Sequence, residues 1–174
     1  ATLVDGSDRK VNLDSDQRVT VHQGGGSVEA NWKMPNDFTL TSVSSYRWWD
    51  FTPRNDDGLD VPVAYNAGVS VKDKQWSQEF RLASPTGGDF DYVVGAYYFG
   101  ALDNVSTLGK GHIETNSLAL FAQGTWHLTP QLDFTAGLRG TYEEKSAWVT
   151  RDAPVGGASV TGAAAIARQA RVGA

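Results

Sequence analysis

Residues 117–143 read SLALFAQGTWHLTPQLDFTAGLRGTYE, and this stretch decides the fold. After Pro130, one set of alternate positions holds Leu, Phe, Ala, Leu, Gly and Tyr, and the other holds Asp, Thr, Gly, Arg, Thr and Glu. Because side chains along a β-strand have a period of two, each set lies on one face of a sheet. Proline fixes φ for a tight turn, so the stretch predicts a β-hairpin with one apolar and one polar face.

The same alternation recurs along the chain and predicts an all-β, antiparallel up-and-down meander of about six strands. The expected strands cover residues 28–34 (or from as early as 18), 38–51, 71–84, 90–102, 117–128 and 132–148. Three connections are short and contain a proline: 34–37, 84–89 and 128–131. The other connections, 52–70, 103–116 and the residues after 148, are expected to be long and polar. Short turns at one end and long loops at the other are typical of outer-membrane barrels.

The aromatic residues gather toward the two ends of the expected strands. Near the short turns lie Trp32, Phe38, Phe90, Tyr92, Trp126 and Phe134, and toward the long loops lie Tyr46, Trp48, Trp49, Trp76, Tyr97, Tyr98, Tyr142 and Trp148. Two such belts with small residues between them match the aromatic girdles of a membrane barrel. Two alternatives stay open on this pattern. One is a soluble β-sandwich that binds carbohydrate, and the other is a complete small barrel with extra strands at 9–23 and 155–161.

The composition excludes several classes of protein. The 174 residues carry a formal net charge of -5, which argues against a nucleic-acid-binding surface. No apolar run approaches the ~18 residues of a transmembrane helix, and the absence of cysteine excludes a disulfide scaffold. The start of the chain does not read as a signal peptide. No constellation of acid, base or nucleophile occurs, so neither an enzyme nor a cofactor is expected.

Three stretches together resemble the barrel domain of TonB-dependent outer-membrane receptors. They are FTLTSVSSYR at 38–47, WSQEFRLASP with FDYVVGAYYF at 76–99, and ALFAQGTWHLT with LDFTAGLR at 119–139. The resemblance implies an arc of a transmembrane barrel in the bacterial outer membrane that takes up a scarce nutrient, such as a ferric siderophore. It implies as partners the membrane lipid, the remaining barrel strands, a plug domain in the lumen, TonB acting through that plug, and an unidentified small-molecule ligand.

Departures from the family pattern suggest that residues 1–174 are a partial barrel domain, with its strand-rich part at about 28–148. Neither a plug domain nor a TonB box is recognised ahead of Val28, and no closing strand with a terminal aromatic residue follows. Six strands are few beside the 22 of plugged outer-membrane transporters. We therefore expect an internal piece of a receptor, with an irregular N-terminal segment. Residues 162–171 are rich in Ala, Arg and Gln, so a short C-terminal helix is expected there.

Two groups of charged residues are candidates for functional contacts. The polar faces of the expected strands carry Arg47, Glu79, Arg81, Arg139 and Glu143. In a barrel these side chains point into the lumen, where water or the plug surrounds them. The polar loop NDDGLD at 55–60 and the neighbouring Arg54 provide external ligand candidates, namely Arg54, Asp56, Asp57 and Asp60. Closely spaced oxygen ligands can hold Ca²⁺, but the loop lacks the EF-hand spacing, so a solvated loop remains the alternative.

Two remaining features suggest no chemistry. The histidines His22, His112 and His127 lie on separate segments, without the spacing of a metal site. His127 lies beside a short turn, where a polar side chain is ordinary. Residues 23–27 read QGGGS and lack the lysine and helix of a phosphate-binding loop, so they are expected to form a flexible turn.

Overall fold

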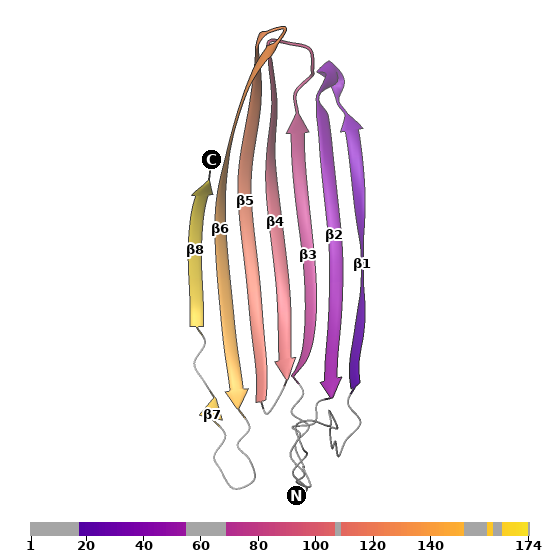
Figure 1. The fold of residues 1–174 in the computed structure, drawn as a ribbon, viewed down its shortest axis with the longest axis vertical. Coiled ribbons are helices and arrows are strands. Elements are labelled where there is room, and N and C mark those ends of the chain that lie inside the picture. Colours follow the sequence, from indigo (N-terminus) through magenta and orange to yellow (C-terminus); the bar gives the residue numbers. More distant parts are fainter. Residues whose placement is uncertain (1–17, 55–68, 107–108, 152–159, 162–164, 174) are drawn as a thin grey trace, which may run out of the picture.

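The computed structural model describes residues 18–54, 69–106, 109–151, 160–161 and 165–173, and their strands form one antiparallel sheet (Figure 1). The strands are β1 (Arg18–Lys33), β2 (Thr39–Arg54), β3 (Ser70–Ala83), β4 (Phe90–Ser106), β5 (Gly109–Thr129), β6 (Leu132–Arg151), β7 (Val160–Thr161) and β8 (Ala165–Gly173). Strands β1 to β6 each pair with the next strand, and β7 and β8 both pair with β6. The predicted six-stranded meander is therefore confirmed.

The three short proline-containing connections lie at one end of the sheet (Figure 1). Pro35 begins the 3-10 turn η1 (Pro35–Asp37), in which Asn36 and Asp37 have φ angles of 71° and 61°. Asn and Asp tolerate this left-handed region better than other residues with a Cβ, so they can reverse the chain here. The Met34 amide closes the turn by donating to the Phe38 carbonyl at 2.8 Å.

Strand β1 begins at Arg18, so residues 23–27 form part of a strand, and the prediction of a flexible turn there was wrong. Gly24 is paired with Trp48, and a Cβ built on Gly24 would lie 2.9 Å from Nε1 of that indole. The glycine makes room for an aromatic side chain of the neighbouring strand, which is a recognised use of glycine inside a sheet.

The connection between β4 and β5 is much shorter than the long polar loop predicted at 103–116. Strand β4 continues to Ser106 and β5 begins at Gly109, with unbroken pairing from Ser106–Lys110 onward. The residues concerned are mostly polar, and the apolar Val105 and Ile113 share the face of Asp103, so the apolar–polar alternation fades although the backbone stays paired. A strand that meets water on both sides has no apolar face to reveal it.

The expected C-terminal helix is replaced by a strand. Residues 165–173 form β8, which pairs antiparallel with residues 139–147 of β6. A helix of this length is marginal by itself, because nucleation is costly. The free edge of β6, by contrast, offers a row of backbone donors and acceptors, and pairing with it outweighs the helix propensity of alanine.

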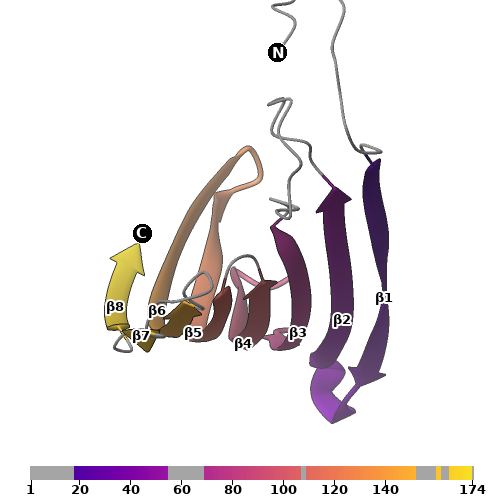
Figure 2. The same ribbon diagram turned by 90° about the horizontal axis from the view of Figure 1, so that it is seen from below.

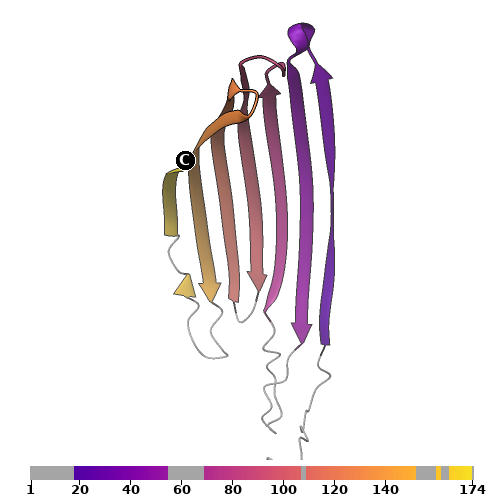
Figure 3. The same ribbon diagram turned by 45° about the horizontal axis from the view of Figure 1, so that its top comes forward.

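Figure 2 shows that the sheet curls like a trough, with β1 and β8 at its two open edges. Figure 3 shows β1 to β6 lying side by side over most of their length. The described residues form a single layer without a second sheet packed on it, so the sandwich alternative is not adopted. Among these residues, none lies in a helix with the length and hydropathy needed to cross a membrane.

Candidate functional site

The register gives the sheet two chemically different faces. Directly paired residues place their side chains on the same face, and from β1 to β6 even-numbered residues pair with even-numbered ones. The only shift in these ladders is a bulge between His127 and Thr129. We call the face of the even-numbered residues the apolar face and that of the odd-numbered residues the polar face.

The apolar face exposes most of the large hydrophobic side chains. It carries Val28, Trp32, Tyr46, Trp48, Phe80, Phe90, Val94, Tyr98, Leu118, Leu120, Trp126, Phe134, Leu138, Tyr142 and Trp148. Leu120 is 64% exposed and Leu138 is 59% exposed. Soluble monomers rarely expose a contiguous apolar surface larger than a few hundred Å². This face therefore has the composition of a surface in contact with hydrocarbon.

Two aromatic belts border this apolar surface. At the short-turn end, Trp126 pairs with both Phe90 and Phe134. At the other end, Tyr46 pairs with Trp76, and Tyr98 lies farther along the sheet. About eight residues separate Phe90 from Tyr98, or ~27 Å along a strand and ~20 Å in height at a tilt of ~40°. This height is close to the ~25 Å apolar band of a membrane barrel.

Glycines on this face accommodate flat aromatic rings. A Cβ built on Gly100 would overlap the indole of Trp76, and one built on Gly124 would overlap the ring of Phe90. Each ring thus lies over the backbone of a neighbouring strand, an arrangement that stabilises glycine within a sheet. The rings of Trp76 and Phe90 therefore pack against the sheet.

The register places all five charged strand candidates, Arg47, Glu79, Arg81, Arg139 and Glu143, on the polar face. Glu79 and Arg81 form an ion pair at 3.1 Å, and Glu143 contacts Lys145 at 3.2 Å. The Arg139 guanidinium lies 5.6 Å from the centre of the Tyr97 ring and 5.8 Å from that of Phe121. Arg81 on β3 and Arg139 on β6 are three strands apart, so the structure does not join these residues into one cluster.

The polar face is also the more sheltered one. Its centre holds the small residues Ala101, Thr115, Ser117 and Ala119, all less than 9% exposed. Side chains on the inner side of a curved sheet crowd together, so this burial identifies the polar face as the inside of the trough in Figure 2. The ion pairs of this face remain partly solvated, with side-chain exposures of 42% and 29% for Arg81 and Glu79. Such pairs contribute little to stability.

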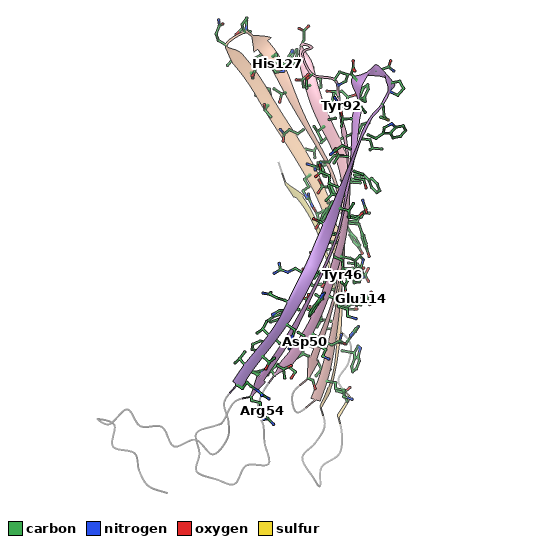
Figure 4. The ribbon with its side chains drawn as sticks, turned by 90° about the vertical axis from the view of Figure 1, so that its right-hand side faces the viewer. Tyr46, Asp50, Arg54, Tyr92, Glu114 and His127 are labelled. Carbon is green, nitrogen blue, oxygen red and sulfur yellow. The ribbon has the colours of Figure 1, made fainter. Side chains whose placement is uncertain are left out.

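A histidine bracketed by two carboxylates lies on the polar face at the short-turn end. His127 Nδ1 is 2.7 Å from Asp133 Oδ1, and its Nε2 is 3.1 Å from Asp91 Oδ2. The hydrogen bonds to Asp133 and then to Asp91 raise the pKa of His127 above its ordinary value. Figure 4 shows His127 close to this end of the sheet, and the three residues tie together β4, β5 and β6.

A pair of carboxylates occupies the opposite end of the same face. Asp73 on β3 is paired directly with Asp103 on β4. The pKa of Asp103 is raised to about 6, first by burial and then by the hydrogen bond and the charge of Asp73, while Lys145 and His112 act in the opposite direction. Sequence reasoning missed this pair because it assigned Asp103 to a loop, and it missed the bracketing of His127 because three strands contribute to it.

The two-faced sheet can be compared with known protein families and structures. The family model described as TonB dependent receptor-like, beta-barrel matches residues 3–166. The chain belongs to the TonB-dependent receptor β-barrel family. The fold is similar to the crystal structure of the ferric yersiniabactin uptake receptor FyuA from Yersinia pestis, with a TM-score of 0.73 and 14% sequence identity. This match covers 95% of the present chain and 27% of the FyuA chain, and a search of curated proteins gave no match.

In this TonB-dependent receptor segment, the external ligand candidates are only partly placed. Arg54 is the last residue of β2 and lies at the end of the sheet opposite His127 (Figure 4). Asp56, Asp57 and Asp60 lie outside the described residues. Within the described ranges, no group of three or more His, Cys, Asp or Glu side chains is arranged to hold a metal ion.

Proposed function

We propose that this chain forms part of the barrel wall of an outer-membrane receptor that takes up a scarce nutrient, such as a ferric siderophore, by TonB-dependent transport. The observation that carries the proposal is the division of one curved sheet into an exposed apolar face with two aromatic belts and a sheltered polar face. Membership of a family of outer-membrane transporters supports it. The similar FyuA structure is that of a ferric yersiniabactin uptake receptor.

In this proposal, the apolar face contacts membrane lipid and the polar face lines the lumen. Water or the plug domain then surrounds the lumen-facing side chains of Arg47, Glu79, Arg81, Arg139 and Glu143. Lumen charges of this kind cost little, because they stay hydrated or paired. Residues 1–174 are one partial barrel domain, and the plug lies outside them. TonB acts on the receptor through the plug.

The open edges of the sheet fit a partial barrel. An unpaired strand edge cannot be left in hydrocarbon, because each unsatisfied backbone group costs several kcal/mol there. Further strands of the receptor therefore have to pair with β1 at one edge of the sheet and with β6 or β8 at the other edge. The short turns then face the periplasm, and the opposite end faces outward, where Arg54, Asp56, Asp57 and Asp60 are candidates for ligand contact.

The absence of native cysteine in this segment makes the assignment of faces directly testable. Leu120→Cys and Gln123→Cys lie on opposite faces of β5, three residues apart. In receptor reconstituted into vesicles, a water-soluble maleimide should label Gln123→Cys and leave Leu120→Cys protected. After solubilisation in denaturant, both should react. Equal labelling of the two variants in vesicles would overturn the proposed position in the membrane.

Transport itself is tested in cells that carry the receptor. Uptake of a labelled panel of metal chelates should depend both on the receptor and on TonB. Loss of uptake of one chelate on receptor deletion identifies the nutrient. Uptake that continues unchanged without TonB contradicts the proposed mechanism of energy transfer.

A further inference from the structure

Three polar side chains lie together on the apolar face, in the part of the sheet formed by β1, β2 and β3. They are Ser42 and Ser44 on β2 and Gln78 on β3, and Ser44 is paired directly with Gln78. Gln78 Oε1 accepts a hydrogen bond from the Ser44 hydroxyl, and Gln78 Nε2 donates to Ser42 Oγ at 3.0 Å. We call these three residues the polar patch.

The polar patch lies between the two aromatic belts. Going along β2 toward its short turn, the residues of the apolar face are Trp48, Tyr46, Ser44, Ser42 and Leu40. The partner of Leu40 on β1 is Trp32, which belongs to the belt at the short turns. Both serines are therefore inside the apolar band, where a barrel normally presents hydrocarbon side chains to lipid. Polar groups at this depth are costly, and they commonly mark a function.

The other half of the same face has a different composition. Between the rows of Tyr98 and Tyr92, the described residues that β4, β5 and β6 present on this face are all apolar: Val94, Ala96, Leu120, Ala122, Leu138 and Gly140. Lipid tails alone can cover these residues. One wall in one membrane thus carries two kinds of surface, and the polar patch calls for a contact that lipid tails cannot make.

The polar patch has hydrogen-bonding capacity for a partner. The Ser42 hydroxyl accepts from Gln78 and can still donate its own proton, whereas Gln78 Oε1 has a second lone pair besides the one that meets Ser44. In hydrocarbon this capacity would stay unmet, at a cost in free energy. The patch is uncharged, and it presents a donor and an acceptor side by side.

Small residues beside the polar patch let another protein surface come close. On β1, Gly26 and Ala30 flank Val28, which is 71% exposed and is paired directly with Ser44. A Cβ built on Gly26 would meet nothing within 4 Å. Contacts between membrane-spanning segments are rich in such small residues and in Ser and Gln side chains that hydrogen-bond across the contact. This part of the face therefore has the composition of a protein interface.

We propose that the polar patch is the centre of a contact between two copies of the receptor within the membrane. The proposal rests on the membrane position proposed above. Two copies in one membrane have the same orientation, so a two-fold axis along the membrane normal brings equal heights together and places the patch against its own copy. A charged group would meet its like across such an axis. An uncharged patch with one donor and one acceptor is instead complementary to itself.

Cross-linking tests whether this surface meets a second copy. The experiment uses the complete purified receptor, without other cysteines, in vesicles at a low ratio of receptor to lipid. Val28→Cys adjoins the polar patch without belonging to it, and Leu120→Cys lies on the same face with a similar exposed fraction, 64% beside 71%. A short membrane-permeant cross-linker for thiols should join two copies through Val28→Cys and leave Leu120→Cys monomeric.

A pair of matched substitutions tests whether the polar patch provides the contact. Energy transfer between fluorophores attached at Thr86→Cys, in the turn between β3 and β4, measures the association of two copies. Gln78→Leu removes the amide from both copies, so two symmetry-related hydrogen bonds are lost. One such bond within a membrane changes association about threefold, so the dissociation constant should rise about eightfold. Gln123→Leu makes the same change on the polar face and should alter association less than twofold.

Several outcomes overturn the contact between copies. They are unchanged association of Gln78→Leu, equal weakening by Gln123→Leu, and cross-linking of Val28→Cys that is no more efficient than that of Leu120→Cys. Capture of a different protein at position 28 in native membranes, with no second copy, also overturns it. Labelling of Leu120→Cys and Gln123→Cys in the same vesicles separates the two proposals. Inserted receptor that stays monomeric refutes only the contact, whereas receptor that does not insert refutes both.

Discussion

Leu120→Arg tests most directly whether the apolar face meets lipid. Leu120 is 64% exposed and lies about six residues from Trp126, which is ~20 Å along β5 and ~15 Å in height at a tilt of ~40°. It therefore lies within the apolar band, two residues from the row of Tyr98, where the cost of an arginine falls between roughly 2–4 kcal/mol at the midplane and roughly 0–1 kcal/mol at the interface. The same substitution at an exposed position in water usually changes stability by less than about 0.5 kcal/mol.

The measurement is the free energy of unfolding of the receptor in lipid vesicles, obtained by denaturant titration. Leu120→Arg should lose about 1–3 kcal/mol, between the midplane and interface costs, or fail to assemble. Gln123→Arg, on the polar face three residues away, should stay within about 0.5 kcal/mol of the unchanged receptor. Leu120→Phe keeps the position apolar, and lipid should tolerate it, whereas a close-packed core would resist the larger ring.

Two results together would refute this reasoning. One is that both arginine variants unfold at the same denaturant concentration, and the other is that Leu120→Phe is as harmful as Leu120→Arg. Leu120 would then pack against protein, and the assignment of the apolar face to lipid would be wrong.

Three further predictions concern packing and charge. Gly100→Val should displace the Trp76 indole and lower the free energy of unfolding by about 1–3 kcal/mol, with a shift in tryptophan fluorescence. In the wild type, protonated His127 should contribute stability that is full below pH 6.5 and is lost as pH rises through the elevated folded-state pKa. His127→Gln should lack this contribution, as measured by thermal unfolding across pH. The folded wild type holds the proton of the Asp103 carboxyl more tightly than the unfolded chain does, so its stability should fall as pH rises from about 4 to about 6. Asp103→Asn should flatten this fall.

Each of these has its own control and contrary outcome. Gly140→Val is the matched control for Gly100→Val, because a Cβ there meets nothing within 4 Å, and equal damage by both would discount the packing of Trp76. A difference between wild type and His127→Gln that grows toward high pH would contradict the bracketing by carboxylates. An Asp103→Asn variant with the pH profile of the wild type would show that Asp103 titrates normally.

The sequence predicted the strands and their faces well where one face is apolar. The alternation in β5 and β6 around Pro130 is a local signal, since each residue's face follows from its parity alone. The three proline turns are local signals too. The division of Leu120 and Gln123 between two faces, and the common face of Arg81 and Arg139, therefore needed no knowledge of tertiary contacts.

Features that depend on neighbouring strands were not predictable in this way. Gly24 reads as a turn residue until Trp48 is known to lie over it. Residues 162–171 read as a helix until the free edge of β6 is present to pair with residues 165–173. The bracketing of His127 needs Asp133 from β6 and Asp91 from β4, which only the register brings together. In each case the deciding partner lies at least several residues away on another strand.

The continued pairing of β4 with β5 past the aromatic belt has a consequence for engineering this receptor. The segments around Asp103 and Glu114 look like surface loop in the sequence, yet they belong to a continuous backbone ladder. A peptide inserted there would break ladder hydrogen bonds, each with a net contribution of about 1 kcal/mol. These segments therefore behave as framework: an epitope tag placed within them should disturb the barrel wall, although the sequence around them is mostly polar.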